Sequence, residues 1–139
     1  MGKRYRVFGT TADVGVKSIG RDLKEAFENQ AAGMFAVMAD LRAVKTTQSF
    51  RVAASGHDNE SLLVSFLNEL LFIFDTEHVF LKEFRITGLD GHNLTAEAKG
   101  EEIDPARHII KTPVKAVTYH KLSVDDSPGM ASTTVVYDI

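Results

Sequence analysis

The chain has 139 residues, 44% of them hydrophobic and 25% charged, which is the composition of an ordinary globular protein and predicts one domain over residues 1–139. It contains no cysteine, so disulfides, thiolate catalysis and cysteine-bound metals are excluded, and any metal site must use oxygen or imidazole ligands. The net charge of −3 argues against autonomous binding to nucleic acid, whose affinity comes largely from phosphate neutralisation.

The first part of the chain predicts two short strands. Residues 5–7 and 14–16 each place a hydrophobic residue at every second position, as half-buried strands do, and residues 9–13 separate them. Asp13 therefore lies at the mouth of a strand, where it is either a turn residue that bonds its own backbone or a functional carboxylate. The segment 1–11 begins with basic residues but lacks the apolar core of a signal peptide, so we expect a cytoplasmic protein.

Two longer segments have helical periodicity. From Asp22 to about Asp40, hydrophobic residues recur every three or four positions, and Asp22 with Glu25 has the spacing of a helix-capping box. The run Asn59–Glu77 is the most apolar in the chain and has the same periodicity. It is long enough to cross a bilayer, but polar and acidic residues interrupt it, so we interpret it as a buried helix of a soluble protein without membrane contact. Its hydrophobic residues extend beyond one stripe, which predicts contacts on more than one side.

The rest of the chain predicts strands joined by turns. Strands are expected at residues 48–55, 79–87, 94–98, 114–124 and 132–137, with turns at Asp90-Gly91 and at residues 127–129. Two long helices and about seven strands, with consecutive hairpins in the second half, indicate an α+β fold. We expect a mixed, largely antiparallel sheet with both helices packed on one face.

The end of the chain is the most informative candidate site, since the sequence has no Gly-rich phosphate loop, HExxH motif or nucleophile elbow. The alternation up to Tyr137 predicts a strand that places Asp138 beside the terminal carboxylate of Ile139. Together with Asp13, these groups would form an all-oxygen site for calcium or magnesium. The alternative is a disordered tail, which is the commoner fate of a chain end.

Two further segments are candidates for contacts with a partner. Residues 100–108 form a charged loop, although most such loops are simply solvated. On the predicted strand 113–120, Lys115 lies on one face and His120 on the other, and both faces mix polar and apolar residues. At least one of these faces is therefore expected to meet a partner or a polar site.

Several segments of the chain resemble the archease family. They are TTADVG near the start, ESLLVSFLNELLFIFDTE in the middle, DPARH, VKAVTYHKLSV and the terminal YDI, in that order and over almost the full length. The resemblance implies a small cytosolic protein with a mixed sheet packed on two helices. It places the metal ligands of that family at Asp13, Asp138 and Ile139, with calcium as the expected ion and magnesium or manganese as alternatives.

The resemblance also has consequences for the polar segments. Lys115 and His120 match the polar strand of the family, and Arg107 and His108 match its polar loop, as partner-facing or site-supporting groups. Two positions depart from the family pattern: the family usually has His at the position of Thr10, and a more aliphatic ending at the position of Tyr137. The missing histidine is expected to weaken the metal site or to alter its metal preference.

The role that the resemblance implies is that of an accessory protein and not an enzyme. Archease assists the GTP-dependent RNA ligase that joins broken RNA ends, as in tRNA splicing, by promoting ligase guanylylation and repeated turnover through bound metal. The expected partner is an RNA ligase of that type, with tRNA met only through the ligase. Two alternatives are a metal-dependent phosphoester hydrolase that uses the same carboxylates, and an RNA-binding chaperone, against which the acidic net charge argues.

Overall fold

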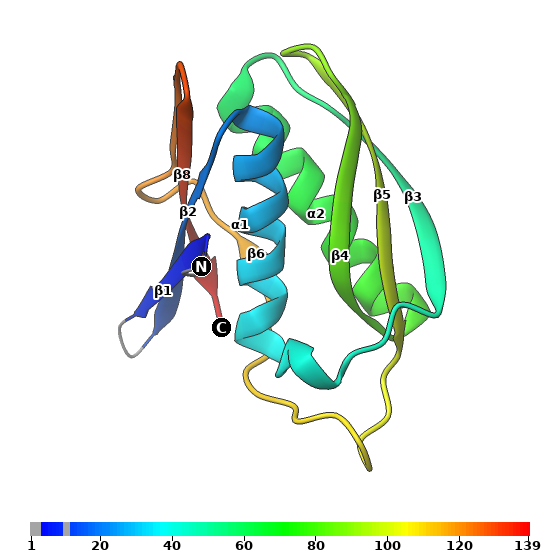
Figure 1. Cartoon of the computed structure of the whole chain (residues 1–139). Coiled ribbons are helices and arrows are strands. Elements are labelled where there is room, and N and C mark those ends of the chain that lie inside the picture. Colours follow the sequence, from blue (N-terminus) through cyan, green and yellow to red (C-terminus); the bar gives the residue numbers. More distant parts are fainter. Residues whose placement is uncertain (1–3, 10–11) are drawn as a thin grey trace.

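Two antiparallel sheets enclose a layer of two helices in the computed structural model, which describes residues 4–9 and 12–139 (Figure 1). The first sheet has the strand order β1-β2-β8-β6, with β7 also paired to β8, and the second has the order β3-β5-β4. The strands of the first sheet are β1 (Tyr5–Gly9), β2 (Asp13–Gly20), β6 (Ala116–Val117), β7 (Ser123–Ser127) and β8 (Met130–Asp138). The strands of the second are β3 (Gln48–Ser55), β4 (Val79–Leu89) and β5 (Asn93–Glu102). The helices are α1 (Leu23–Met38) and α2 (Asn59–Glu77), and a short 3-10 helix (Leu41–Ala43) follows α1.

The α+β class predicted from the sequence is confirmed, but its strands form two sheets where one was expected. The reason lies in the helices, whose hydrophobic residues extend round more than one side. Helix α1 packs on β2 and β8 with one side and on β4 with another, while α2 contacts both sheets as well. Each sheet can therefore bury its hydrophobic face against the same helical layer, so both faces are covered without the need for a single wide sheet.

Both long helices begin at a capping aspartate. The Asp22 side chain accepts a hydrogen bond from the Glu25 N–H at 2.9 Å, and Glu25 reaches back to the Arg21 N–H instead of closing the predicted box on Asp22. In α2 the box is complete, because Asp58 accepts from the Ser61 N–H and its own N–H donates to Ser61 Oγ. These caps fix where each helix starts and hence which side chains face the sheets.

One predicted strand is wrong. Residues 114–124 form only the short β6 and the beginning of β7, with a turn between them in which Lys121 has a φ of 54°. Both strands pair with the same side of β8, Val117 with Tyr137 and Ser123 with Thr134. The chain therefore covers more residues than β8 does over this distance, and the surplus folds outward as a turn. Alternation alone cannot reveal such a surplus.

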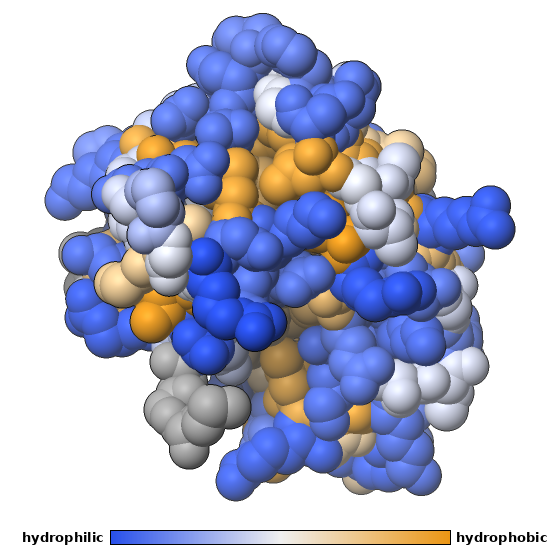
Figure 2. Space-filling model, turned by 45° about the horizontal axis from the view of Figure 1, so that its top comes forward, coloured by the Kyte–Doolittle hydropathy of each residue, from blue (hydrophilic) through white to orange (hydrophobic). Residues whose placement is uncertain are grey.

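The hydrophobic core fills the space between the two sheets and around the helices. On the face shown in Figure 2, hydrophobic residues reach the surface in separate patches among mostly hydrophilic residues, most clearly at the upper centre. In the part of the chain that the structure describes, neither helix combines the length and the apolar character needed to cross a membrane. The largest fully buried side chains include Phe27, Phe35, Phe66, Phe80 and Tyr137.

A directed chain of hydrogen bonds crosses the core beneath the first sheet. The Tyr137 hydroxyl donates to Gln30 Oε1 at 2.7 Å, and Gln30 Nε2 donates to Thr133 Oγ1 at 2.7 Å. The Ser18 hydroxyl donates to the Ala26 carbonyl oxygen, so the Thr133 hydroxyl must donate to Ser18 Oγ across 2.6 Å. Each polar side chain of this network has a hydrogen-bond partner, and the network joins β8, α1 and β2.

Candidate functional site

Two aspartates face each other at the open end of the first sheet. Asp13 is the first residue of β2 and Asp138 is the last residue of β8, and the antiparallel register pairs them directly. The adjacent pair, Val14 and Tyr137, is buried in the core, so alternation along the strands places both aspartates on the opposite face. Directly opposed residues of this kind have Cβ atoms about 5 Å apart, which lets two carboxylates share one ligand.

The neighbours of this pair bring further groups to the same end. Ile139 is half-buried and packs against the core, which holds the main chain beside Asp138. On the other side of β8, Ala116 pairs with Asp138, and the Lys115 N–H donates to the Asp138 carbonyl oxygen at 2.8 Å. Lys115 is exposed, so a cationic side chain starts next to the two carboxylates. We call Asp13, Asp138 and Ile139 the carboxylate end.

The donor set of the carboxylate end fits a hard divalent cation. Calcium and magnesium prefer carboxylate and main-chain oxygens, and like charges opposed on neighbouring strands repel until a cation offsets them. Within residues 4–9 and 12–139, no three His, Asp or Glu side chains gather closely enough to bind one metal ion. A cation here would therefore depend on the two aspartates together with the main-chain oxygens of Ile139.

The structure places His120 differently from the prediction, in a turn and not on a strand. His120 is exposed in the turn between β6 and β7, where its N–H donates to Thr118 Oγ1 at 3.2 Å. Thr10 lies outside the described residues, so the effect expected from its replacing a histidine stays a prediction.

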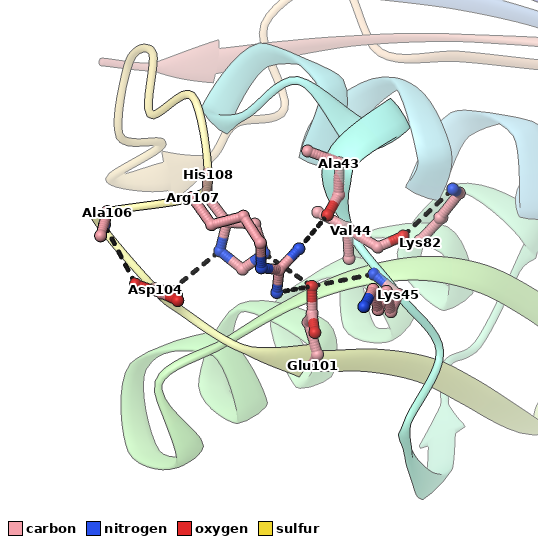
Figure 3. Close-up of polar contacts among 9 residues, drawn as sticks. All are labelled: Ala43, Val44, Lys45, Lys82, Glu101, Asp104, Ala106, Arg107 and His108. Carbon is pink, nitrogen blue, oxygen red and sulfur yellow. Dashed lines mark hydrogen bonds and ion pairs between the residues drawn. The ribbon is translucent and has the colours of Figure 1, made fainter.

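Arg107 and His108 belong to a second cluster, centred on Glu101 (Figure 3). Oε1 of Glu101 accepts hydrogen bonds from the Arg107 guanidinium and from His108 Nε2, the latter at 2.7 Å. The same oxygen accepts from the Lys45 N–H at 2.9 Å, and Arg107 also donates to the Ala43 carbonyl oxygen at 2.6 Å. The cluster thus ties the loop after β5 to the segment that follows α1.

The hydrogen-bond partners of His108 define its protonation state. The Asp104 N–H donates to His108 Nδ1 at 2.9 Å, so Nδ1 carries no hydrogen. Nε2 must then carry the hydrogen that bonds Glu101, and the imidazole is neutral. His108 is only 5% exposed and lies edge-on to Phe80 with ring centroids 5.5 Å apart. This burial argues against the partner-facing role expected for His108, and its hydrogen bonds hold the loop after β5 in place. Its expected role in supporting a functional site stays a prediction.

Sequence reasoning missed Glu101, the centre of this cluster. The Arg107 guanidinium, with smaller contributions from the Lys45 N–H and His108, lowers the pKa of the Glu101 carboxyl to about 2. Glu101 is the last but one residue of β5, and no spacing rule connects it to Arg107 or to a main-chain N–H of a distant segment. Only the path of the loop over the end of β5 brings these groups together.

A model of the Archease protein family (MTH1598/TM1083) matches residues 5–139 of the chain. The chain belongs to the archease family. Protein archease of Methanothermobacter thermautotrophicus is 40% identical over 140 residues, and that of Sulfurisphaera tokodaii is 37% identical over 139 residues. Each alignment covers 99% of this chain and 99% of the relative.

Solved structures agree with the archease assignment. The solution structure of Methanobacterium thermoautotrophicum protein 1598 is 41% identical, has a TM-score of 0.84, and is matched over 99% of this chain and 100% of that one. The crystal structure of a Thermotoga maritima archease, described as a possible chaperone, has a TM-score of 0.60 over 95% of this chain and 94% of that one. At 18% identity, this second likeness supports the fold alone.

Tyr137 departs from the aliphatic residue expected of an archease, and the structure explains how the fold accepts it. The side chain is fully buried, and burial raises the pKa of its hydroxyl well above the ordinary value. The hydroxyl therefore stays protonated and donates to Gln30 on α1. A larger and more polar residue fits here because the neighbouring helix supplies a matching acceptor.

Proposed function

We propose that the protein assists a GTP-dependent RNA ligase that joins broken RNA ends in the cytoplasm, as in tRNA splicing, and that it raises ligase guanylylation and turnover. Membership in the archease family supports this proposal. The main structural support is the direct pairing of Asp13 with Asp138 at the end of the sheet, where a bound cation would be accessible to a partner protein. The role is that of an activator, and the chemistry belongs to the ligase.

In this proposal Asp13, Asp138 and the main-chain carboxylate of Ile139 hold one divalent cation, with calcium as the ion that we favour. When bound, the cation supplies positive charge that can offset phosphate charge in a docked active site. The residues of the chain would hold and orient this cation. The β2–β8 ladder sets the spacing of the aspartates, and the packing of Ile139 anchors the strand end. Lys115 adds a second cation beside them.

The test measures guanylylation of the purified cognate ligase with GTP and the divalent ion. The native protein should raise the rate or the number of turnovers. Asp138→Asn keeps the size of the side chain but removes its charge, so stimulation should fall to near the level of the ligase alone. The control is Asp126→Asn, an exposed aspartate on β7, which should stimulate normally.

Two results would contradict the proposal. The first is an unchanged guanylylation rate and turnover number at saturating native protein. The second is hydrolysis of phosphoesters by the purified protein alone that depends on Asp13 and Asp138, because this result would favour the metal-dependent hydrolase.

A further inference from the structure

Most of the stretch between β5 and β7, after Asp104, is basic, whereas the whole chain is acidic. Residues 105–121, which we call the basic segment, contain four Lys and Arg residues and no Asp or Glu, whereas the chain has 19 acidic residues against 16 basic ones. Arg107 is paired with Glu101, whereas Lys111, Lys115 and Lys121 are exposed. The Lys111 Nζ also donates to the Ala36 carbonyl oxygen at 3.4 Å and lies near the Asp40 carboxylate. The basic segment is therefore a cationic strip on an acidic protein.

The basic segment also exposes two large aliphatic side chains at consecutive positions of the chain. Ile109 is 57% exposed and Ile110 is 51% exposed. Their backbone is fixed, because the Asp40 N–H donates to the Ile109 carbonyl oxygen at 3.0 Å and Ile110 forms a bridge with Ala39. Adjacent aliphatic side chains in water on a fixed backbone contribute little to the core and resemble the apolar centre of a protein contact.

The isoleucine pair lies within reach of the carboxylate end. After Ile110, the Lys111 N–H donates to the Met38 carbonyl oxygen at 2.8 Å, and the Lys115 N–H donates to the Asp138 carbonyl oxygen at 2.8 Å. The five residue steps from Ile110 to Lys115 span at most about 17 Å even when fully extended. A standard protein interface of about 800 Å² per partner can therefore include both features.

We propose that Ile109, Ile110 and Lys111 form a docking site for a protein partner whose surface is acidic around an apolar recess. This proposal rests on the proposed function, in which that partner is the RNA ligase. Aliphatic side chains gain free energy when buried against apolar protein surface but can neither stack on bases nor hydrogen-bond with them, which favours protein over RNA.

The first experiment compares two hydrophobic surface sites. Ile109→Ser/Ile110→Ser should weaken binding of the purified ligase, measured by calorimetry, at least about tenfold. The matched control is Phe72→Ser, which removes a side chain that is 62% exposed on α2 and should leave the affinity unchanged. Thermal unfolding and calcium binding should be the same for all three proteins, since none of the three side chains belongs to the core or to the carboxylate end.

The second experiment tests charge without altering the isoleucine pair. Lys111→Glu should weaken ligase binding and reduce its dependence on salt, because a cation facing acidic groups becomes an anion. The control is Lys24→Glu, a charge reversal of an exposed lysine on α1, which should change neither quantity.

Several outcomes would overturn the docking proposal. They are a native chain that does not bind the ligase, equal affinities for the native chain and the isoleucine variant, or an equal loss in Phe72→Ser. Loss of binding to an RNA oligonucleotide with intact ligase affinity would assign the basic segment to RNA instead. If the native chain binds the ligase but does not stimulate guanylylation, the proposed function fails while the binding comparison still decides the docking site.

Discussion

Individual buried polar side chains are tolerated in this core because each finds a partner of the right kind. Gln30 is completely buried on α1, yet its amide donates to the Val16 carbonyl oxygen and to Thr133 and accepts from Tyr137. An unpaired amide at this depth would cost about 1–3 kcal/mol. The residue thus specifies how α1 sits on β2 and β8.

Removing the Tyr137 hydroxyl tests this network. Tyr137→Phe keeps the ring but leaves Gln30 Oε1 without its donor, so we expect a loss of about 1–2 kcal/mol in the free energy of unfolding. Urea unfolding at neutral pH measures it. Tyr119→Phe, at a side chain that is 64% exposed, is the control and should shift stability by less than about 0.5 kcal/mol. Equal stabilities of the native and Tyr137→Phe proteins would refute the role given to the hydroxyl.

Lys115 should matter for the partner and not for the fold. Lys115→Ala retains the main-chain hydrogen bond to Asp138 and removes an exposed side chain. The free energy of unfolding should therefore change by less than about 0.5 kcal/mol. Ligase stimulation should nevertheless fall, while Lys24→Ala should leave it intact. A collapse of the unfolding midpoint would mean that Lys115 is structural.

Among the secondary-structure elements, helix α1 depends on the loop after β5 for the capping of its C-terminal end. Helix α1 has no basic residue in its last turn, and its final carbonyl groups need donors. The N–H groups of Lys111 and Thr112 donate to the Met38 and Val37 carbonyl oxygens at 2.8 and 3.2 Å. The Glu101 cluster fixes the start of the same loop, so one irregular segment caps a helix and joins both sheets.

The Glu101 cluster predicts a specific acid sensitivity. The pKa of Glu101 is lowered from its ordinary 4.5 to about 2, so the native carboxylate stays charged between those values while the unfolded chain takes up a proton. Its contribution is present above about pH 4.5 and is lost as the pH falls towards about 2. Glu101→Gln should therefore be less stable by about 1–3 kcal/mol at pH 7, with a smaller difference at pH 3. Urea unfolding at both values checks this, and a constant difference would contradict it.

The sequence predicts features that depend on residues close together in the chain, and it misses features that depend on contacts between distant segments. The sequence correctly predicts the starts of the two helices, near Asp22 and Asn59, and the Asp90-Gly91 turn, because these features depend on neighbouring residues. The separation into two sheets depends on which strands pair with each other, and hydrophobic periodicity along the sequence does not predict strand pairing. The role of Glu101 was missed for the same reason, because its hydrogen-bond partners include groups from distant segments.

At the scale of the whole molecule, the fold brings both ends of the chain to one place. Strands β2 and β8 lie side by side within the first sheet (Figure 1). Their register makes Asp13 and Asp138 direct neighbours. The sequence predicted that these two acids act together, because family resemblance and strand alternation agreed on them. The register of the sheet supplies the geometry that the proposed cation site requires.

In the proposed function, the register of β2 and β8 builds one cation site, and calorimetric titration with calcium tests this site most directly. The native protein should bind one ion, and Asp13→Asn and Asp138→Asn should each lose binding because a carboxylate ligand is removed. Asp126→Asn should bind normally. A short extension fused after Ile139 keeps every side chain and removes only the terminal carboxylate, so it should weaken binding as well. Calcium binding of native strength in both the Asp13→Asn and the Asp138→Asn proteins would contradict the account.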